Sequence, residues 1–353
     1  MTKLTVVMAA LCLALPCAFG APDSTGALVA ACKAPAQKLD EAGFVRIGGI
    51  EQWITIKGDN CANPVILMLH GGPGNTNSPF ADAAYGSWYQ HYTVVQWDQR
   101  GAGMTYGKSK PGPGDMLTIE QMRDDGIAVT NYLRAHLGAS KVILMGGSWS
   151  SILGVHMAKA RPELFHAYIG SAHMVNFRIN QAATYNQTLA LARAAGDAET
   201  VGKLTALGEP PWTNPRHFGV LRRAVRKYEA MTSVPAPREW SVPTALYATP
   251  QAQADYDAGE DYSFIQAVGL KGDGMFSKVD LPALGLDFGL PVFFVEGEQD
   301  LLTTPALARA YFDSIKAPLK EFVLVPKAGH DPNPPYLEAQ WKVLNERVRP
   351  LVK

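Results

Sequence analysis

Buried strands alternate with helices along most of this chain. Continuous apolar runs at 65–69, 92–97 and 142–145 are typical of strands that are covered on both faces. Helices are expected at 118–137, where apolar residues recur at helical spacing, and at 149–160. Alternating strands and helices form a mostly parallel sheet, because each helix crosses over the sheet and brings the next strand alongside. The sequence therefore predicts an α/β fold of the doubly wound kind.

One long segment interrupts this alternation. Strand-like runs vanish from it, and Ala-rich helical stretches alternate there with clusters of Pro. After it, strands at 291–296 and 322–325 resume the earlier pattern. We predict a lead-in, a core in two parts and a helical cap inserted between them: 21–43 for the lead-in, 44–173 and 286–353 for the core, and 174–285 for the cap.

Residues 1–20 have the layout of a secretory signal peptide. An apolar run of twelve residues, 4–15, follows one basic side chain, and the small residues Ala18 and Gly20 precede a cut ahead of Ala21. The run is too short to span a bilayer. The alternative is a buried N-terminal helix. We predict an exported protein, periplasmic or secreted, whose mature chain has no membrane span.

Cysteine usage fits an exported protein. Removal of the signal peptide leaves two cysteines, Cys32 and Cys61, an even pair in an oxidising compartment. A disulfide between them closes a loop of about 30 residues and adds roughly 3 kcal/mol of stability in the chain-entropy model. The alternative is two separate buried thiols. We predict the Cys32–Cys61 disulfide.

Charge and composition exclude several classes of function. The chain carries 32 basic and 32 acidic side chains, so it lacks the basic surplus that nucleic acids and anionic membranes attract. With 47% apolar residues it has ample material for a packed core. It contains no HExxH, no CxxC, no dinucleotide fingerprint after its first strand and no Walker loop. We therefore expect no metal, no cofactor and no nucleic-acid partner.

A candidate nucleophile lies between a buried strand and a helix. The sequence Gly146-Gly147-Ser148-Trp149-Ser150 stands at this junction. A nucleophile on so tight a turn needs small residues two positions before and after it, which Gly146 and Ser150 provide. The helix N-terminus favours negative charge beside the hydroxyl. The alternative is a Gly-rich turn with a helix-capping Ser, and we predict that Ser148 is the catalytic nucleophile.

A second loop supplies backbone donors. His70-Gly71-Gly72-Pro73-Gly74 follows the strand 65–69, and glycine lets a backbone approach a reacting group closely. Acyl transfer requires N–H groups aimed at the developing oxyanion. We predict that these are the N–H groups of Gly72 and Trp149. His70 is expected to shape the loop rather than act as the base.

A serine nucleophile also needs a base and an acid that orients the base. Asp300 follows the predicted strand 291–296, and His330 follows the predicted strand 322–325. Both therefore belong at the end of the sheet that carries Ser148, and they occur in the order nucleophile, acid, base. Together with Ser148 they form a predicted catalytic triad.

Two other acids compete with Asp300 for this role. Asp331 adjoins His330 in sequence, which makes it hard for its carboxylate to face the ring. Glu298 is the substitute if Asp300 does not fit.

Five motifs of this chain resemble those of a known family of peptidases. The motifs resemble those of the prolyl aminopeptidase (proline iminopeptidase) family of serine peptidases: HGGPG at 70–74, WDQRGAG at 97–103, GGSWS at 146–150, GEQD at 297–300 and AGH at 328–330. The resemblance implies an α/β-hydrolase fold with a helical cap between the sixth and seventh strands. It also implies a triad of Ser148, His330 and Asp300 that releases an N-terminal residue, usually Pro, from peptides. Arg100 is expected to brace the loops near the site.

The resemblance also implies that the cap binds the free amine of the substrate. Family members present carboxylates there, one of them after a Trp, but this chain has no Trp-Glu pair. The acidic candidates in the insertion are Glu209, Glu229, Glu239 and Glu260. We expect Glu209 and Glu229 to bind substrate. Apolar walls are expected from cap aromatics, namely Tyr185, Trp212, Trp240 and Phe264.

These patterns together predict an exported serine hydrolase. Its expected activity is that of an aminopeptidase that releases Pro or a small residue from short peptides. One alternative is a carboxylesterase that acts on small esters. The other is a binding protein that keeps the fold without the reaction, because function belongs to the site and not to the fold.

Overall fold

The computed structural model describes residues 36–352. The predicted signal peptide at 1–20 and Cys32 lie outside the described residues. Cys61 is buried, and its bridge to Cys32 stays a prediction. Within residues 36–352 no helix is long and apolar enough to cross a membrane.

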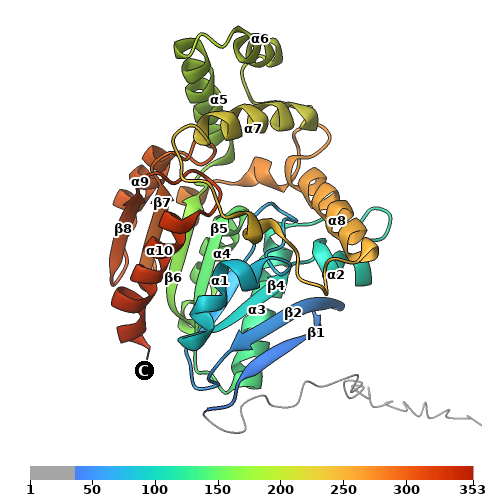
Figure 1. The fold of residues 1–353 in the computed structure, drawn as a ribbon, viewed down its shortest axis with the longest axis vertical. Coiled ribbons are helices and arrows are strands. Elements are labelled where there is room, and N and C mark those ends of the chain that lie inside the picture. Colours follow the sequence, from blue (N-terminus) through green and yellow to red (C-terminus); the bar gives the residue numbers. More distant parts are fainter. Residues whose placement is uncertain (1–35, 353) are drawn as a thin grey trace, which may run out of the picture.

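An eight-stranded sheet forms the centre of the molecule (Figure 1). Its strands lie in the order β1-β2-β4-β3-β5-β6-β7-β8. In chain order they are β1 Leu39–Ile47, β2 Ile50–Gly58, β3 Val65–Leu69, β4 Thr93–Asp98, β5 Val142–Ser148, β6 Phe165–His173, β7 Val292–Gly297 and β8 Lys320–Val325. From β4 onward in the sheet all neighbours are parallel. The mostly parallel sheet predicted from the alternation of strands and helices is confirmed.

The first strand corrects one predicted boundary. β1 begins at Leu39, inside the segment 21–43 that the sequence assigned to a lead-in. Leu39 pairs with Gly58, so the β1–β2 hairpin is antiparallel along its whole length. Leu39 is also buried in the core, which is why the strand starts there. Its alternating polar residues concealed it, because one face of this edge strand is exposed to water.

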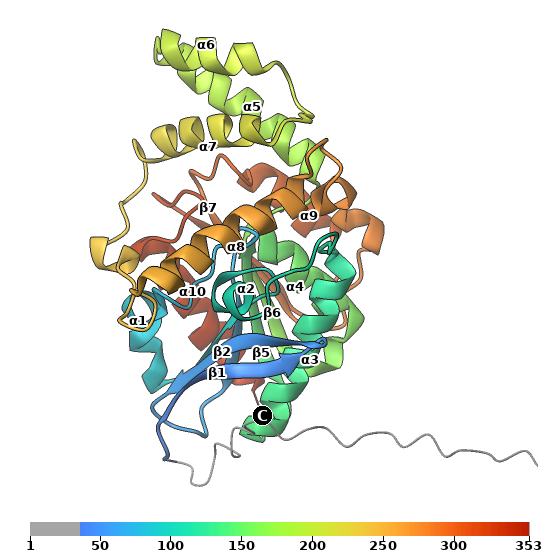
Figure 2. The same ribbon diagram turned by 90° about the vertical axis from the view of Figure 1, so that its right-hand side faces the viewer.

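Helices cover both faces of the sheet (Figure 2). The helices α3 and α4 lie on one side, with α1 and α10 on the other. Along β3 the side chains alternate between these two layers, Leu67 on the α3 side and Met68 on the α1 side. The core helices are α1 Ala81–Tyr85, α2 Gly103–Lys108, α3 Ile119–Leu137, α4 Trp149–Ala160, α9 Pro305–Ser314 and α10 Pro334–Val343.

A helical insertion joins β6 to β7. It contains α5 Phe177–Ala194, α6 Ala198–Leu207, α7 Pro215–Glu229 and α8 Pro250–Val268. The helices α5, α6 and α7 form a lobe above the carboxyl ends of the strands, and α8 runs separately beside α2 (Figures 1 and 2). A Cβ atom on Gly259 of α8 would lie 3.1 Å from the backbone nitrogen of Gly103, closer than ordinary contact, so glycine favours this close approach of α8 to α2.

Local capping fixes where the cap helices begin. Asn176, Asn214 and Thr249 precede α5, α7 and α8, and each side chain accepts a backbone N–H of the first turn. Pro215 and Pro250 then occupy the first helical positions, where a missing N–H costs nothing.

Candidate active site

Ser148 occupies a strained turn between β5 and α4. Its φ and ψ are 56° and −124°, in a region that non-glycine residues rarely adopt. A Cβ atom on Gly146 would lie 2.5 Å from the Ser150 carbonyl oxygen, so the turn requires glycine there. Ser150 Oγ accepts the Gly147 N–H at 2.9 Å and donates to the Leu69 carbonyl at 2.7 Å. A serine therefore replaces the second glycine because its hydroxyl ties the turn to β3.

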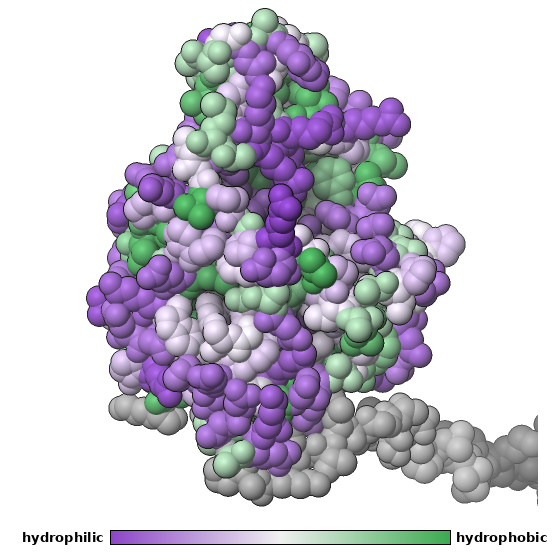
Figure 3. Space-filling model, in the orientation of Figure 1, coloured by the Kyte–Doolittle hydropathy of each residue, from purple (hydrophilic) through white to green (hydrophobic). Residues whose placement is uncertain are grey.

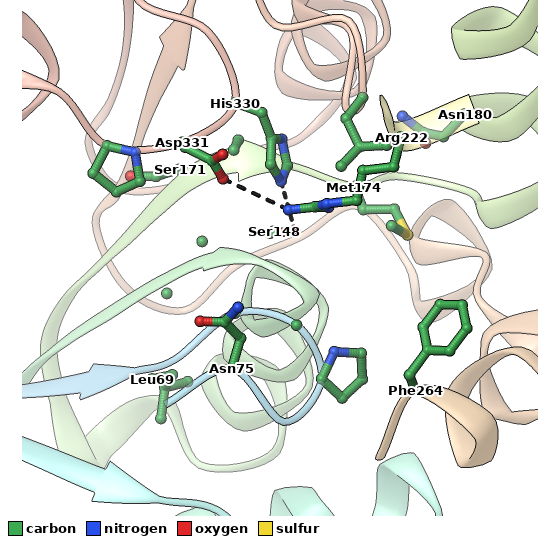
Figure 4. Close-up of a pocket in the computed structure, with 18 of the residues that line it drawn as sticks. Leu69, Asn75, Ser148, Ser171, Met174, Asn180, Arg222, Phe264, His330 and Asp331 are labelled. Atoms are coloured by element: carbon green, nitrogen blue, oxygen red, sulfur yellow. Dashed lines mark hydrogen bonds and ion pairs between the residues drawn. The ribbon is translucent and has the colours of Figure 1, made fainter. Parts of the chain in front are cut away.

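The structure brings the three predicted side chains together. His330 Nε2 lies 3.0 Å from Ser148 Oγ (Figure 4). On the other side of the ring, His330 Nδ1 lies 3.0 Å from Asp300 Oδ2. Asp300 Oδ1 accepts the backbone N–H groups of Leu302 and Thr303, both at 2.8 Å. The carboxylate is 1% exposed and held from several directions, so it fixes the imidazole in one orientation.

Both competing acids lie elsewhere. The Asp331 carboxylate pairs with Arg222, at an N–O distance of 3.7 Å, and within residues 36–352 it forms no hydrogen bond with the His330 ring. Glu298 is exposed on the loop before Asp300. Asp300 is the acid that contacts His330.

The opposite charges of Asp300 and His330 shift the pKa of each buried side chain toward its charged form. Burial alone would raise the pKa of Asp300, but the His330 charge and the hydrogen bonds from His330 and Thr303 outweigh it, so this pKa is lowered. Burial alone would lower the pKa of His330, but the charge and hydrogen bond of Asp300 outweigh it, so this pKa is raised. Asp300 is therefore ionised, and His330 is a stronger base than a free imidazole.

Thr303 supports the same pair. Its hydroxyl donates to Asp300 Oδ2 at 2.7 Å and lies 3.2 Å from His330 Nδ1. Thr303 is the third residue after Asp300, and this spacing places its N–H and its hydroxyl on the same carboxylate. Thr303 was not among the residues predicted from the sequence, although its spacing from Asp300 was the signal that could have indicated it.

Glu229 lies beneath the triad and not in the substrate space. Its carboxylate accepts the N–H of Leu301 at 2.8 Å and the N–H of His330 at 3.3 Å. The side chain thus joins the end of α7 to the loops that carry the acid and the base. Burial, reinforced by the negative charge of Asp300, raises the pKa of Glu229 to about 7. Glu229 does not line the cavity over Ser148, and its contacts suit a residue that positions the two loops; its role in binding substrate stays a prediction.

The loop before α1 is fastened to the nucleophile turn by Gln99. His70 Nε2 accepts the Gln99 N–H at 3.1 Å, and the Gln99 amide donates to the His70 carbonyl. The Gln99 Oε1 atom accepts the Trp149 indole N–H at 2.9 Å. Burial lowers the pKa of His70 to about 4, so the ring is neutral. His70 therefore shapes the loop, as predicted, and His330 is the imidazole that contacts Ser148 Oγ.

The predicted oxyanion donors flank Ser148. A Cβ atom on Gly71 would lie 3.6 Å from the Ser148 Cβ atom, which places this loop against the nucleophile. Gly72 has a φ of 109°, a backbone conformation that glycine adopts readily and other residues rarely do. Trp149 is the first residue of α4, so its N–H has no acceptor within the helix.

Arg100 braces a different part of the molecule. Its guanidinium binds both oxygens of Asp125 in α3, at 2.8 and 3.1 Å, and donates to the Gly48 carbonyl at 2.7 Å. It therefore holds the β1–β2 turn against α3 and does not brace the loops around Ser148.

A cavity of about 490 Å³ lies over Ser148 between core and cap (Figure 4). Its apolar walls come from both parts of the chain and include Met145, Phe177, Phe218, Leu221, Phe264 and Tyr336. Its polar lining includes Asn75, Glu260 and Arg222, and Figure 4 shows Asn75 and Arg222 on different sides of Ser148. Figure 3 shows hydrophilic side chains gathered where the cap lobe meets the core.

Most of the substrate-binding residues predicted in the cap lie outside this cavity. Glu209 is exposed on the loop between α6 and α7. Trp212 is buried inside the lobe, where its ring meets Tyr185 edge to face at 5.8 Å. Among the four expected cap aromatics, Phe264 lines the cavity. Glu260 of α8 is the acidic candidate that reaches it. Composition identified the candidates, but helix packing decided which of them face Ser148.

Comparison with known proteins agrees with this architecture. A family model described as the alpha/beta hydrolase fold matches residues 64–334, more than half of the chain. The chain belongs to the α/β-hydrolase fold family. The predicted fold is therefore confirmed, including the nearly parallel sheet with a cap after β6.

The chain is also similar to individual proteins named as aminopeptidases or proline iminopeptidases. A protein named probable aminopeptidase YbaC of Bacillus subtilis (strain 168) is 29% identical over 81% of this chain and 89% of its own length. A probable proline iminopeptidase of Streptomyces coelicolor is 35% identical, but the match covers 30% of this chain and 32% of that protein. The crystal structure of a proline iminopeptidase of Mycobacterium smegmatis superposes with a TM-score of 0.62 at 22% identity, over 88% of this chain and 97% of that one. The similarity to proteins named as aminopeptidases and proline iminopeptidases, which the motifs predicted, is confirmed.

Proposed function

We propose that this protein is an exported serine aminopeptidase that releases an N-terminal Pro or small residue from short peptides. The observation that carries the proposal is the hydrogen-bonded series Ser148, His330 and Asp300 at the base of a cavity that also holds an acidic side chain of the cap. The similarity to an aminopeptidase over most of both chains supports it.

The proposed reaction is acyl transfer to Ser148. His330 Nε2 takes the hydroxyl proton while Ser148 Oγ attacks the carbonyl carbon of the scissile bond. The N–H groups of Gly72 and Trp149 stabilise the oxyanion. His330 then donates its proton to the leaving amine, and the bond between carbonyl carbon and nitrogen breaks. Water, activated by the same imidazole, hydrolyses the acyl-enzyme, and Asp300 holds the ring throughout.

The acidic group at one end of the cavity is suited to the free amine of a substrate. Glu260 lies on α8, and its Oε1 atom is 3.4 Å from the Asn75 amide on the loop that carries Gly72. Asp261 lines the same cavity. A buried ammonium group is costly to desolvate unless a carboxylate pairs with it. We therefore assign amine recognition to Glu260, in place of the predicted Glu209 and Glu229.

Three substrates test this assignment: a prolyl or alanyl anilide with a free amine, its N-acetylated twin, and a short p-nitrophenyl ester. The wild-type protein is expected to prefer the free anilide over the acetylated one by at least about tenfold in kcat/KM, as for one charged contact. Glu260→Gln should bring this ratio close to one, because the amide cannot neutralise the ammonium group. The measurement is kcat/KM for each substrate in parallel.

Glu209→Gln is the matched control. It removes the same charge from the exposed loop outside the cavity, so the preference for the free amine should persist. Equal cleavage of the free and acetylated anilides by the wild type would refute the aminopeptidase proposal. Turnover of the ester alone would instead support a carboxylesterase, which needs no anion in its acyl pocket.

Export is the remaining part of the proposal. It rests on the apolar run at 4–15 and the small residues before Ala21. N-terminal sequencing of the protein recovered from the periplasm or medium is expected to begin at Ala21. A chain that retains Met1 in the cytoplasm would contradict it.

A further inference from the structure

Arg222 places a guanidinium beside the triad whose hydrogen-bond donors are not taken up within residues 36–352. It lies on α7 and lines the cavity, and its positive charge acts on His330. Its nearest anion is the Asp331 carboxylate at 3.7 Å, which also lies 3.9 Å from Arg226. Both distances exceed hydrogen-bonding range. Among the described residues, 36–352, Arg222 donates no hydrogen bond, so its planar set of donors is available to a ligand.

Buried amides nearby also lack partners. Asn180 and Gln181 lie in α5, are 2% and 6% exposed, and line the same cavity. Within the part of the chain that the structure describes, Asn180 Nδ2 and both polar atoms of the Gln181 amide have no hydrogen-bond partner. A buried polar group that stays unpaired destabilises the folded protein. These unpaired amide atoms are explained if a polar ligand hydrogen-bonds to them in the cavity.

These groups lie at the leaving-group side of Ser148. Figure 4 shows Arg222 and Asn180 on one side of Ser148, and Asn75 and Phe264 on the other. His330 must reach the leaving nitrogen to protonate it, so the residue after the scissile bond lies beside His330. Its carboxylate carbon is two bonds from that nitrogen, at about 2.5 Å. In a dipeptide substrate, the free C-terminal carboxylate of the leaving residue would therefore lie close to Arg222.

We propose that Arg222, together with the side-chain amides of Asn180 and Gln181, binds the C-terminal carboxylate of a dipeptide. The inference rests on the proposed aminopeptidase function and specifies its substrate class. Glu260 and Arg222 then recognise the two charged ends of the same molecule, with the scissile bond over Ser148 between them. A guanidinium fork matches the two oxygens of a carboxylate, which a single ammonium group does not. Asp331 holds Arg222 near this position without occupying its donors.

Matched dipeptides test the proposal. Pro-Gly with a free carboxylate is expected to exceed its C-terminal amide by at least about tenfold in kcat/KM in the wild-type protein. Arg222→Gln should bring this ratio close to one, and Arg222→Lys should retain part of it because charge remains without the fork. Arg223→Gln is the control, since Arg223 is exposed on the same helix and outside the cavity. It should keep the wild-type ratio.

Arg222 could also bind the carboxylate of an acidic side chain of the substrate. One further substrate distinguishes a side-chain carboxylate from a C-terminal one. Pro-Asp amide carries a side-chain carboxylate but no terminal one. Cleavage of Pro-Asp amide in preference to Pro-Gly would assign Arg222 to a side chain and overturn the proposal. Equal cleavage of Pro-Gly and Pro-Gly amide by the wild type would also overturn it.

A binding measurement distinguishes this failure from failure of the aminopeptidase proposal. A reduced-amide analogue of Pro-Gly cannot be cleaved, and its acid and amide forms are compared as inhibitors of ester hydrolysis. The acid form is expected to inhibit at about tenfold lower concentration, and Arg222→Gln should close the gap. Equal inhibition by both forms refutes the carboxylate subsite even if anilides are cleaved. Tighter inhibition by the acid form, with no peptide cleaved, supports the subsite and refutes the peptidase.

Discussion

Ser148→Ala is expected to lower kcat by about 10⁶-fold, the effect of removing a serine nucleophile whose base and oxyanion donors remain. The hydroxyl is the group that forms the acyl-enzyme, and His330 lies 3.0 Å from it. The wild-type protein should also react with a fluorophosphonate at one site per chain, and Ser148→Ala should abolish this labelling. Ester hydrolysis and intact-mass measurement give the two results.

The control is Ser140→Ala, which removes an exposed hydroxyl far along the sheet from the turn and should label as the wild type does. His330→Ala should label much more slowly, because Ser148 then has no base. A correctly folded wild-type protein that does not label would contradict the enzyme assignment of this site and support a binding protein on the same fold.

Asp300→Asn is expected to lower kcat by about 10⁴-fold while the fold is retained. An amide at this position can donate to His330 Nδ1, which forces the proton onto Nε2 and removes the acceptor that Ser148 needs. The effect also has a pH signature. Asp300 raises the pKa of His330, and catalysis requires the neutral ring, so activity falls as pH drops through that pKa. Without the carboxylate this acid limb should move to lower pH.

The measurement is kcat/KM for a neutral ester across the acid range. Glu298→Gln provides the matched control, because it removes a carboxylate two residues away on the same loop, exposed and without contact to His330. Its activity and its acid limb should stay close to those of the wild type. An Asp300→Asn protein with full activity would show that Asp300 does not orient the base.

Local chemistry explains why much of the core could be predicted. The turn at Gly146-Gly147-Ser148 needs small residues whatever surrounds it, and the structure shows the 2.5 Å contact that a Cβ atom on Gly146 would make. Asp300 and His330 were placed by their strands, since parallel strands carry their following loops to the same edge of the sheet. The start of α4 directly after Ser148 followed from the same turn. None of these inferences needed a long-range contact beyond strand pairing.

The cap could not be predicted in the same way. Its helical character followed from composition, but the residues that face Ser148 depend on the rotation of each helix about its axis. α7 turns Glu229 beneath the triad, where it accepts the Leu301 N–H, and places Arg222 in the cavity. α8 brings in Glu260, while Trp212 is buried inside the lobe.

The sequence by itself determined the sheet, the nucleophile turn and the order of nucleophile, acid and base, because each depends on steric demands and periodicity within a few residues. Tertiary structure alone decided what surrounds the scissile bond. The unpaired amide atoms of Asn180 and Gln181 lie on α5, and the guanidinium of Arg222, which donates no hydrogen bond within residues 36–352, lies on α7. Charges on two helices act on one substrate only after packing sets the distance between them, and no local pattern in the chain encodes that distance.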